Sequence, residues 1–152
     1  MKKLVFLVLS IILINVTSCS LSDDSNNNEP VIITINEWNM INVTGGVSGV
    51  DHDFQIGDIV WVFDNNNSIL NINNNNENAD LEDGLDSGNY NLFFHEHNED
   101  LFLIVEGVEF GEIKISGDDN DDMTIDQNSL STGTGSDGYV YTFKRTTRTV
   151  EL

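Results

Sequence analysis

The feature that most constrains this chain is the lack of any helical pattern beyond residue 31. No ten-residue stretch in that part carries apolar residues at helical spacing, whereas short alternating or apolar runs bounded by Gly, Asn and Asp recur throughout. Eight such runs at this spacing predict an all-β antiparallel sandwich or barrel. The predicted strands are 32–43, 58–64, 68–73, 88–96, 101–106, 108–116, 122–127 and 138–147.

Each predicted strand offers one apolar face, because successive side chains in a strand point to opposite sides. A meander of such strands either leaves two exposed edges or closes on itself, and closure removes the edges that invite aggregation. We therefore predict an eight-stranded antiparallel up-and-down β-barrel rather than a sandwich. The residues expected to point inward are Ile59, Trp61, Phe63, Tyr90, Leu92, Phe94, Phe110, Ile113, Ile115, Tyr139, Tyr141 and Phe143, with a change of parity at Gly111.

The first 18 residues have the three-part layout of a secretory signal peptide. Lys2 and Lys3 precede an apolar run at 4–13 that is shorter than the roughly 20 residues a transmembrane helix needs. Small residues then lead to Cys19, the single cysteine of the chain. Because residues 16–19 resemble the bacterial lipobox, we expect removal of 1–18 and acylation of Cys19. The alternative is an ordinary signal peptide followed by an accidental cysteine.

The expected acylation would hold the mature chain on a membrane, since each buried CH₂ contributes about 0.8 kcal/mol and more than one acyl chain makes anchoring stable. Residues 19–31 are polar and without periodicity, which is typical of a flexible tether. Their acidic start resembles the export signal of surface lipoproteins of Bacteroidota. We therefore expect one domain at 32–152, anchored to the bacterial outer membrane on its periplasmic face or at the cell surface.

The acidic charge of the chain limits the classes of molecule that it can bind. It carries 26 acidic and six basic residues, and two of the basic residues lie in the predicted signal peptide. Binding to a phosphate backbone requires clustered Lys and Arg, so nucleic acid is excluded as a partner. The same charge repels anionic lipid headgroups, so membrane contact is expected through the acylated Cys19 alone.

Candidate catalytic and metal-ligating groups fall short of a site. His95 and His97 share one face of a strand but supply two ligands, whereas structural zinc takes four and catalytic zinc three. Asp118, Asn120 and Asp122 alternate as in a calcium loop, without the Gly and Glu that complete one. No nucleophile-elbow motif is present. We predict no enzyme, no cofactor and no resident metal, while weak metal or calcium binding at these two places stays open.

Several short segments together resemble the lipocalin-like lipoproteins of Bacteroidota, small members of the calycin group of ligand-binding barrels. The resemblance covers nearly the whole mature domain and depends on the order and spacing of its parts. These parts are Glu37-Trp38-Asn39-Met40, Gly45–Gly49, Gly57–Phe63, Ser87–Tyr90, Gly107–Gly111, Ile115–Gly117 and Asp137–Arg145.

The resemblance implies a structural pair at one end of the barrel. Trp38 matches the Trp of the first-strand Gly-x-Trp motif, although Asn36 stands in place of the Gly. Arg145 has the inward parity of the last strand and would pack across the indole, a cation–π contact worth about 0.5–2 kcal/mol. The alternative is that Lys144 and Arg145 form a solvated basic strand end.

The resemblance also implies a binding module for a small hydrophobic molecule held in the barrel mouth. An eight-stranded barrel is just wide enough for its own side chains to fill, so the alternative is a filled barrel in a non-enzymatic interaction or structural lipoprotein. The residues expected to line the ligand site are Trp61, Phe63, Tyr90, Phe94, Tyr139 and Tyr141.

Overall fold

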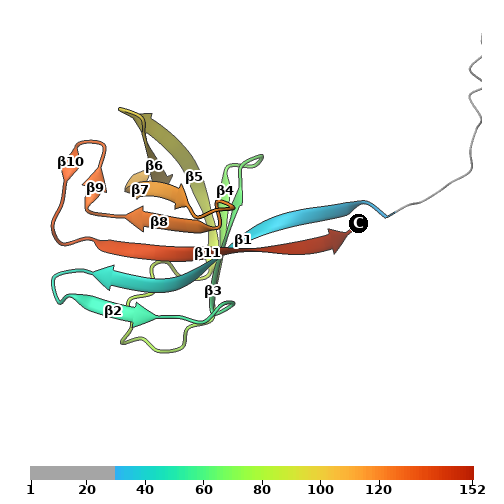
Figure 1. The fold of residues 1–152 in the computed structure, drawn as a ribbon, viewed down its shortest axis with the longest axis horizontal. Coiled ribbons are helices and arrows are strands. Elements are labelled where there is room, and N and C mark those ends of the chain that lie inside the picture. The colour runs from blue at the N-terminus through green and yellow to red at the C-terminus, as the bar shows by residue number, and fades with distance from the viewer. Residues whose placement is uncertain (1–29) are drawn as a thin grey trace, which may run out of the picture. The chain divides into compact units, whose positions relative to one another are not determined.

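The computed structural model describes residues 30–152 of the chain. The predicted signal peptide, Cys19 and nearly all of the predicted tether fall outside these residues. The described part is built from strands (Figure 1), and it contains no helix that is long and apolar enough to cross a membrane. The strands are β1(Ile32–Gly45), β2(Val50–Asp53), β3(Ile59–Asp64), β4(Ile69–Asn74), β5(Gly88–His97), β6(Asp100–Val105), β7(Val108–Ser116), β8(Asp122–Asp126), β9(Ser129–Leu130), β10(Gly133–Thr134) and β11(Tyr139–Glu151).

Eight of these strands form the closed antiparallel barrel that the sequence predicts. The ring runs through β1, β3, β4, β5, β6, β7, β8 and β11, and β11 closes on β1. The extra strand β2 pairs with the end of β1 at 42–45, and β3 meets β1 at Trp38 and Asn39. Since β11 occupies the other edge of β1, β2 and β3 are two pieces of one barrel wall, interrupted at 54–58.

Two elements were missing from the prediction. β2 has the sequence Val-Asp-His-Asp, which offers little apolar alternation. The small β9–β10 hairpin has only two residues in each strand. Both lie beside the predicted strands, so the barrel topology is unaffected.

The inward faces of the strands meet around Trp61, which is completely buried. Its ring centroid lies 5.1 Å from that of Phe143, 5.7 Å from Phe110 and 6.4 Å from Phe63. Such tilted pairs add about 0.5–1.5 kcal/mol each beyond their buried area. The other buried apolar residues of this cluster are Trp38, Met40, Val43, Ile59, Leu70, Ile72, Leu92, Leu103, Val105, Ile113, Met123, Ile125, Tyr141 and Phe143.

The parity change predicted at Gly111 is a β-bulge. The β6–β7 register shifts between Leu103 and Ile104, so that Leu103 lies opposite Gly111 and Ile104 opposite Glu109. Gly111 has φ 150°, and a Cβ there would lie 2.6 Å from the carbonyl oxygen of Asp126. The close approach of β8 therefore requires glycine at this position.

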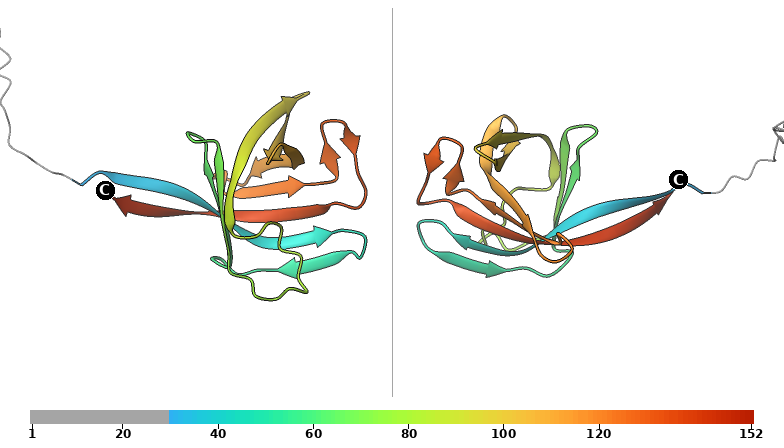
Figure 2. Two further views of the ribbon diagram at one scale, coloured as in Figure 1. Left: turned by 180° about the vertical axis from the view of Figure 1, so that it is seen from behind. Right: turned by 45° about the horizontal axis from the view of Figure 1, so that its top comes forward.

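β1 and β11 stay paired beyond the barrel. Their register runs from Gly45 opposite Tyr139 to Ile32 opposite Glu151. Past Trp38 and Arg145, the two strands leave the barrel as a two-stranded extension, which we call the ribbon and define as residues 32–37 and 146–151 (Figures 1 and 2). The predicted first and last strands ended at 43 and 147, so the last strand in particular is longer than expected.

A buried amide marks the place where the ribbon begins. Asn39 is 2% exposed, and its Nδ2 donates to Thr146 Oγ1 at 2.9 Å. Its Oδ1 accepts from the backbone N–H of Gly57 at 2.9 Å. Asn39 thus joins β1, β11 and the interruption between β2 and β3, and both ends of its amide have partners, as burial of a polar group requires.

Candidate functional site

The barrel interior is occupied by side chains. Among the predicted ligand-lining residues, Trp61 and Tyr141 belong to the buried core. Tyr90 and Tyr139 are half-buried and pack against that core. Phe63 and Phe94 lie together, with ring centroids 6.0 Å apart, but Phe94 is 41% exposed. The structure therefore places Trp61 and Tyr141 inside the core and Phe63, Tyr90 and Tyr139 against it, whereas Phe94 lies past the end of the core.

The connection between β4 and β5, residues 75–87, folds over the core. Gly84 lies against it: a Cβ at this position would be 3.3 Å from Met40 Cε and 3.6 Å from Trp61 Cζ2. Glu82 accepts a hydrogen bond from the Tyr141 hydroxyl at 3.0 Å. Its backbone N–H donates to His52 Nδ1 at 3.0 Å. We call residues 75–87 the cover loop, because these contacts hold it over the interior.

In the contact between Tyr141 and Glu82, the hydroxyl is the donor and the carboxylate is the acceptor. Burial raises the pKa of the Tyr141 phenol above its ordinary value, and the neighbouring Glu82 carboxylate raises it further. Both effects disfavour a phenolate, so the hydroxyl stays protonated and donates a hydrogen bond to the carboxylate. The cover loop is therefore fixed by a charge-assisted hydrogen bond, which is stronger than a neutral one.

One polar atom in the interior stands out. Trp61 Nε1 is the single buried side-chain nitrogen or oxygen in residues 30–152 that has no hydrogen-bond partner. A buried donor without an acceptor costs about 1–3 kcal/mol. A Cβ at Gly84 would lie 3.6 Å from Trp61 Cζ2, which is close to Nε1 in the indole, so the unpaired N–H is near the cover loop.

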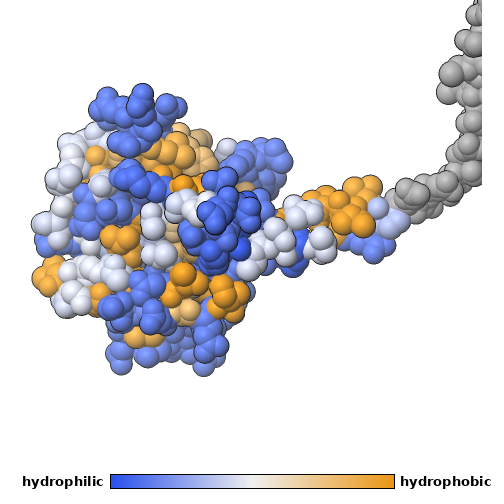
Figure 3. All heavy atoms as spheres, in the orientation of Figure 1, coloured by the Kyte–Doolittle hydropathy of each residue, from blue (hydrophilic) through white to orange (hydrophobic). Residues whose placement is uncertain are grey.

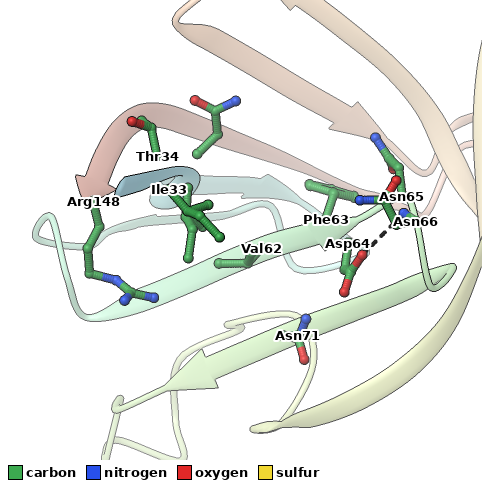
Figure 4. Close-up of a pocket in the computed structure, with 11 residues that line it drawn as sticks. Ile33, Thr34, Val62, Phe63, Asp64, Asn65, Asn66, Asn71 and Arg148 are labelled. Carbon is green, nitrogen blue, oxygen red and sulfur yellow. Dashed lines mark hydrogen bonds between the residues drawn. The ribbon is translucent and has the colours of Figure 1, made fainter. Parts of the chain in front are cut away.

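A groove lies outside the barrel, between the ribbon and the β3–β4 hairpin. β1 and β3 pair only at Trp38–Trp61 and Asn39–Val60, and then part. The opening between them, which we call the fork, has a volume of about 690 Å³. In Figure 4, Ile33 and Arg148 point from the ribbon toward Val62 on β3. The lining residues are Ile33, Thr34, Ile35, Asn36, Val62, Phe63, Asp64, Asn65, Asn66, Asn71 and Arg148.

Charged groups at the fork are held by local contacts. Arg148 Nε donates to Glu37 Oε1 at 2.6 Å, which fixes the guanidinium along the ribbon. Asp64 accepts from the side chain of Asn67 at 2.8 Å and from the backbone of Asn66 at 3.1 Å. The hydrogen bond from the Asn67 side chain, followed by those from the backbone N–H groups of Asn67 and Asn66, holds the pKa of Asp64 below its ordinary value.

Trp38 and Arg145 lie directly opposite each other in the β1–β11 register. Trp38 is 8% exposed. The Arg145 guanidinium donates through Nη2 to the carbonyl oxygen of Asp119 at 2.7 Å, and thereby ties β11 to the turn between β7 and β8. The shared face needed for a cation–π contact is present, and stacking of the guanidinium on the indole stays a prediction.

The acidic turn at 117–121 has a structural role. Lys144 Nζ lies 2.7 Å from an oxygen of Asp121 and 2.8 Å from one of Asp122. The Lys144 hydrogen bond holds the pKa of Asp121 below its ordinary value, and Asp121 and then Asp122 raise the pKa of Lys144. Part of the acidic cluster is therefore paired with the last strand.

The two candidate metal ligands lie at the end of β5. His95 and His97 are exposed, and their rings stack with centroids 6.2 Å apart. His52 lies elsewhere, with its Nδ1 on the cover loop. No group of three or more His, Cys, Asp or Glu side chains within residues 30–152 could hold a metal ion.

The sequence did not predict two features of the structure, the cover loop and the fork. The Asn-rich stretch at 73–76 indicates a loop but carries no signal that the residues after it return to the core, and the contact between Glu82 and Tyr141 joins residues 59 apart. The fork depends on where β1 leaves β3, which periodicity does not indicate. Comparisons with protein-family profiles, curated protein sequences and solved structures found no match to this chain.

Proposed function

We propose that this chain is a lipid-anchored, non-enzymatic binding module of the bacterial outer membrane, in which the barrel is a filled scaffold and the binding surface lies on its outside. The observation that carries this proposal is the packing of the interior. Trp61 and Phe143 are completely buried. The cover loop brings Gly84 against Trp61, Met40 and Tyr141. A core filled in this way leaves recognition to the exterior.

The anchor is tested by mass spectrometry of the mature protein. The proposal predicts an N-terminal Cys19 that carries acyl chains, and loss of membrane association in the Cys19→Ala variant. A mature terminus at another residue, without lipid, would contradict the anchor and leave the barrel argument standing.

The filled scaffold is tested separately, with an apolar fluorescent probe such as 8-anilinonaphthalene-1-sulfonate. A packed core does not admit the probe, so the native protein should give little more emission than buffer, and partly unfolded protein should give much more. Stoichiometric binding of the probe to the native protein would contradict the filled scaffold.

A second candidate function follows from the unpaired Trp61 N–H. If the cover loop opens, a small apolar molecule with one polar oxygen could enter beside Trp61 and satisfy this donor, as ligand sites in barrels combine apolar walls with few polar groups. The test is titration with decanoate in the Trp38→Phe variant, in which Trp61 is the only indole. A saturable change in Trp61 emission favours this candidate, and an unchanged spectrum favours the filled scaffold.

A further inference from the structure

We infer that the fork binds an extended, basic polypeptide segment, which adds as a strand to the free edge of β1. This inference rests on the proposed function and deepens it, because it names the partner that the outer surface of the module fits. Four observations carry it: the direction of the backbone groups, the second open edge opposite them, the exposed side chains and the charge of the chain.

The backbone of β1 directs unpaired groups into the fork. The Leu152 N–H donates to the Val31 carbonyl at 2.9 Å, so Val31 bonds toward β11. Hydrogen-bonded and non-bonded pairs alternate along an antiparallel ladder. The backbone groups of Ile33, Ile35 and Glu37 therefore bond toward β11. Those of Ile32, Thr34 and Asn36 point to the opposite edge of β1, which faces the fork.

β3 offers a second open edge across the groove. The Asn75 N–H donates to the Asp58 carbonyl at 2.8 Å, which sets the alternation of the β3–β4 ladder. By that alternation, Trp61 and Phe63 direct their backbone groups away from β4 and toward β1. Trp61 meets Trp38 there, but Phe63 lies beyond the last β1–β3 pair and lines the fork.

The side chains at this edge lack the features that usually protect one. Natural edge strands carry Pro, Lys or a bulge, or are very short. The edge at 32–37 has none of these: it is Ile-Ile-Thr-Ile-Asn-Glu, and its one charge, Glu37, is paired with Arg148. Ile32 and Ile33 are 67% and 41% exposed, and Figure 3 shows apolar residues gathered toward the tip of the ribbon. Added strands bind by main-chain hydrogen bonds, with side-chain contacts for specificity.

The negative charge of the chain favours a basic polypeptide segment as the partner. The chain carries 26 acidic against six basic residues, so its field attracts cationic segments and repels a second copy of itself. At the fork, Arg148 is already paired with Glu37. The Asp64 carboxylate also lines the fork, and its hydrogen bonds come from the uncharged groups of Asn66 and Asn67. A basic, alternating segment therefore fits both the edge and the field.

The experiment titrates the full-length chain, held in nonionic detergent, with a peptide of about eight alternating Val and Lys residues, the length of an ordinary strand. A matched peptide carries Glu in place of Lys. Amide chemical shifts in ¹H–¹⁵N spectra locate the binding, and they do so in the unmodified protein. We expect shifts at Thr34, Asn36 and Phe63, and affinity at least about tenfold higher for the Lys peptide at low salt, where charges are least screened.

Two proline variants make the matched pair. Thr34 and Thr149 lie opposite each other in a non-bonded pair, so neither N–H belongs to the β1–β11 ladder. Proline removes a backbone donor, and edge positions of this kind tolerate it. Thr34→Pro blocks the edge at the fork and should weaken binding at least about tenfold, whereas Thr149→Pro blocks the far edge of the same ribbon and should change it less than about twofold.

Several results would overturn the inference. They are an absence of shifts at 32–37 in the unmodified protein, equal weakening by the two proline variants, or equal affinity for the Lys and Glu peptides. A dimer that sediments as two chains and is lost in Thr34→Pro would assign the edge to a second copy instead. None of these results bears on the acylation of Cys19 or on the filled core, which have their own tests.

Discussion

β1 and β11 have two halves in contrasting surroundings. In the barrel, Met40 and Phe143 lie opposite each other and are completely buried, and each strand has a neighbour on both edges. In the ribbon, the same strands keep their register, but Ile32 is 67% exposed and the edge of β1 faces the fork. Continuous backbone pairing therefore does not imply a continuous core. The inner half of each strand stabilises the fold, and the outer half is available for recognition.

The largest expected effect is the difference in stability between two variants, one with a truncated side chain in the barrel and one with a truncated side chain in the ribbon. Trp61→Ala should lower the free energy of unfolding by about 3–5 kcal/mol, because it leaves a cavity in the core. Ile33→Ala should lower it by less than about 0.5 kcal/mol, as for other exposed positions. Urea denaturation measures both. Similar losses for the two variants would break the contrast between the barrel and the ribbon.

The boundary between the halves is tested by Trp38 and Arg145. If the guanidinium packs on the indole, a double-mutant cycle with Trp38→Ala and Arg145→Ala should give an interaction energy of about 0.5–3 kcal/mol. The Arg145 bond to Asp119 contributes to the single-variant loss but not to this coupling. Strict additivity would contradict the packing of Arg145 on Trp38 that the resemblance to lipocalin-like lipoproteins implied, and would leave the β1–β11 closure of the barrel unaffected.

The barrel was predictable from the sequence because its strands alternate strongly. Tyr139, Tyr141 and Phe143 all take the inward positions that their spacing indicated, and the bulge at Gly111 could be seen as a change of parity. Phe94 and Ile115 were also expected to be inside but are 41% and 52% exposed, because the alternation of a strand continues past the end of the core.

The candidate site was less predictable, because it depends on contacts between distant parts of the chain. Thr34 and Asn36 give a polar alternation that looks the same whether a neighbour covers their edge or not. The fork arises because β1 and β3 share only two paired positions. Likewise, nothing local to Gly84 indicates that it lies against Met40, which precedes it by a long stretch of chain.

A smaller effect should come from the cover loop. Tyr141→Phe removes the hydrogen bond to the Glu82 carboxylate and should lower the free energy of unfolding by about 1.5–3 kcal/mol, the usual net value of a hydrogen bond to a charged group. Hydrogen exchange of the amides at 78–87 should accelerate, since the loop loses a main contact. An unchanged exchange rate in this loop, with the core equally stable, would show that the cover is held by packing alone.

The smallest effect is electrostatic and should be confined to the turn at 117–121. Lys144 holds the pKa of Asp121 below its ordinary value of 3.8. Their pairing therefore adds to the free energy of unfolding at neutral pH, and this stabilisation is lost as the pH falls through the lowered pKa. At the alkaline side, the same pairing raises the pKa of Lys144 above 10.5, and the contribution is lost above that. In Lys144→Met, the carboxyl resonance of Asp121 should titrate at higher pH. An unchanged titration would assign the shift to another group.

Native-state hydrogen exchange along β1 tests the central contrast most directly, because it compares two halves of one strand in one protein. Amides that bond to β11 within the barrel should exchange only through global unfolding, whereas those of Ile33, Ile35 and Glu37 should exchange through local opening of the ribbon, at a free energy several kcal/mol lower. Uniform protection from Ile33 through Val43 would contradict the account, because the ribbon would then be part of the same cooperative unit as the filled barrel.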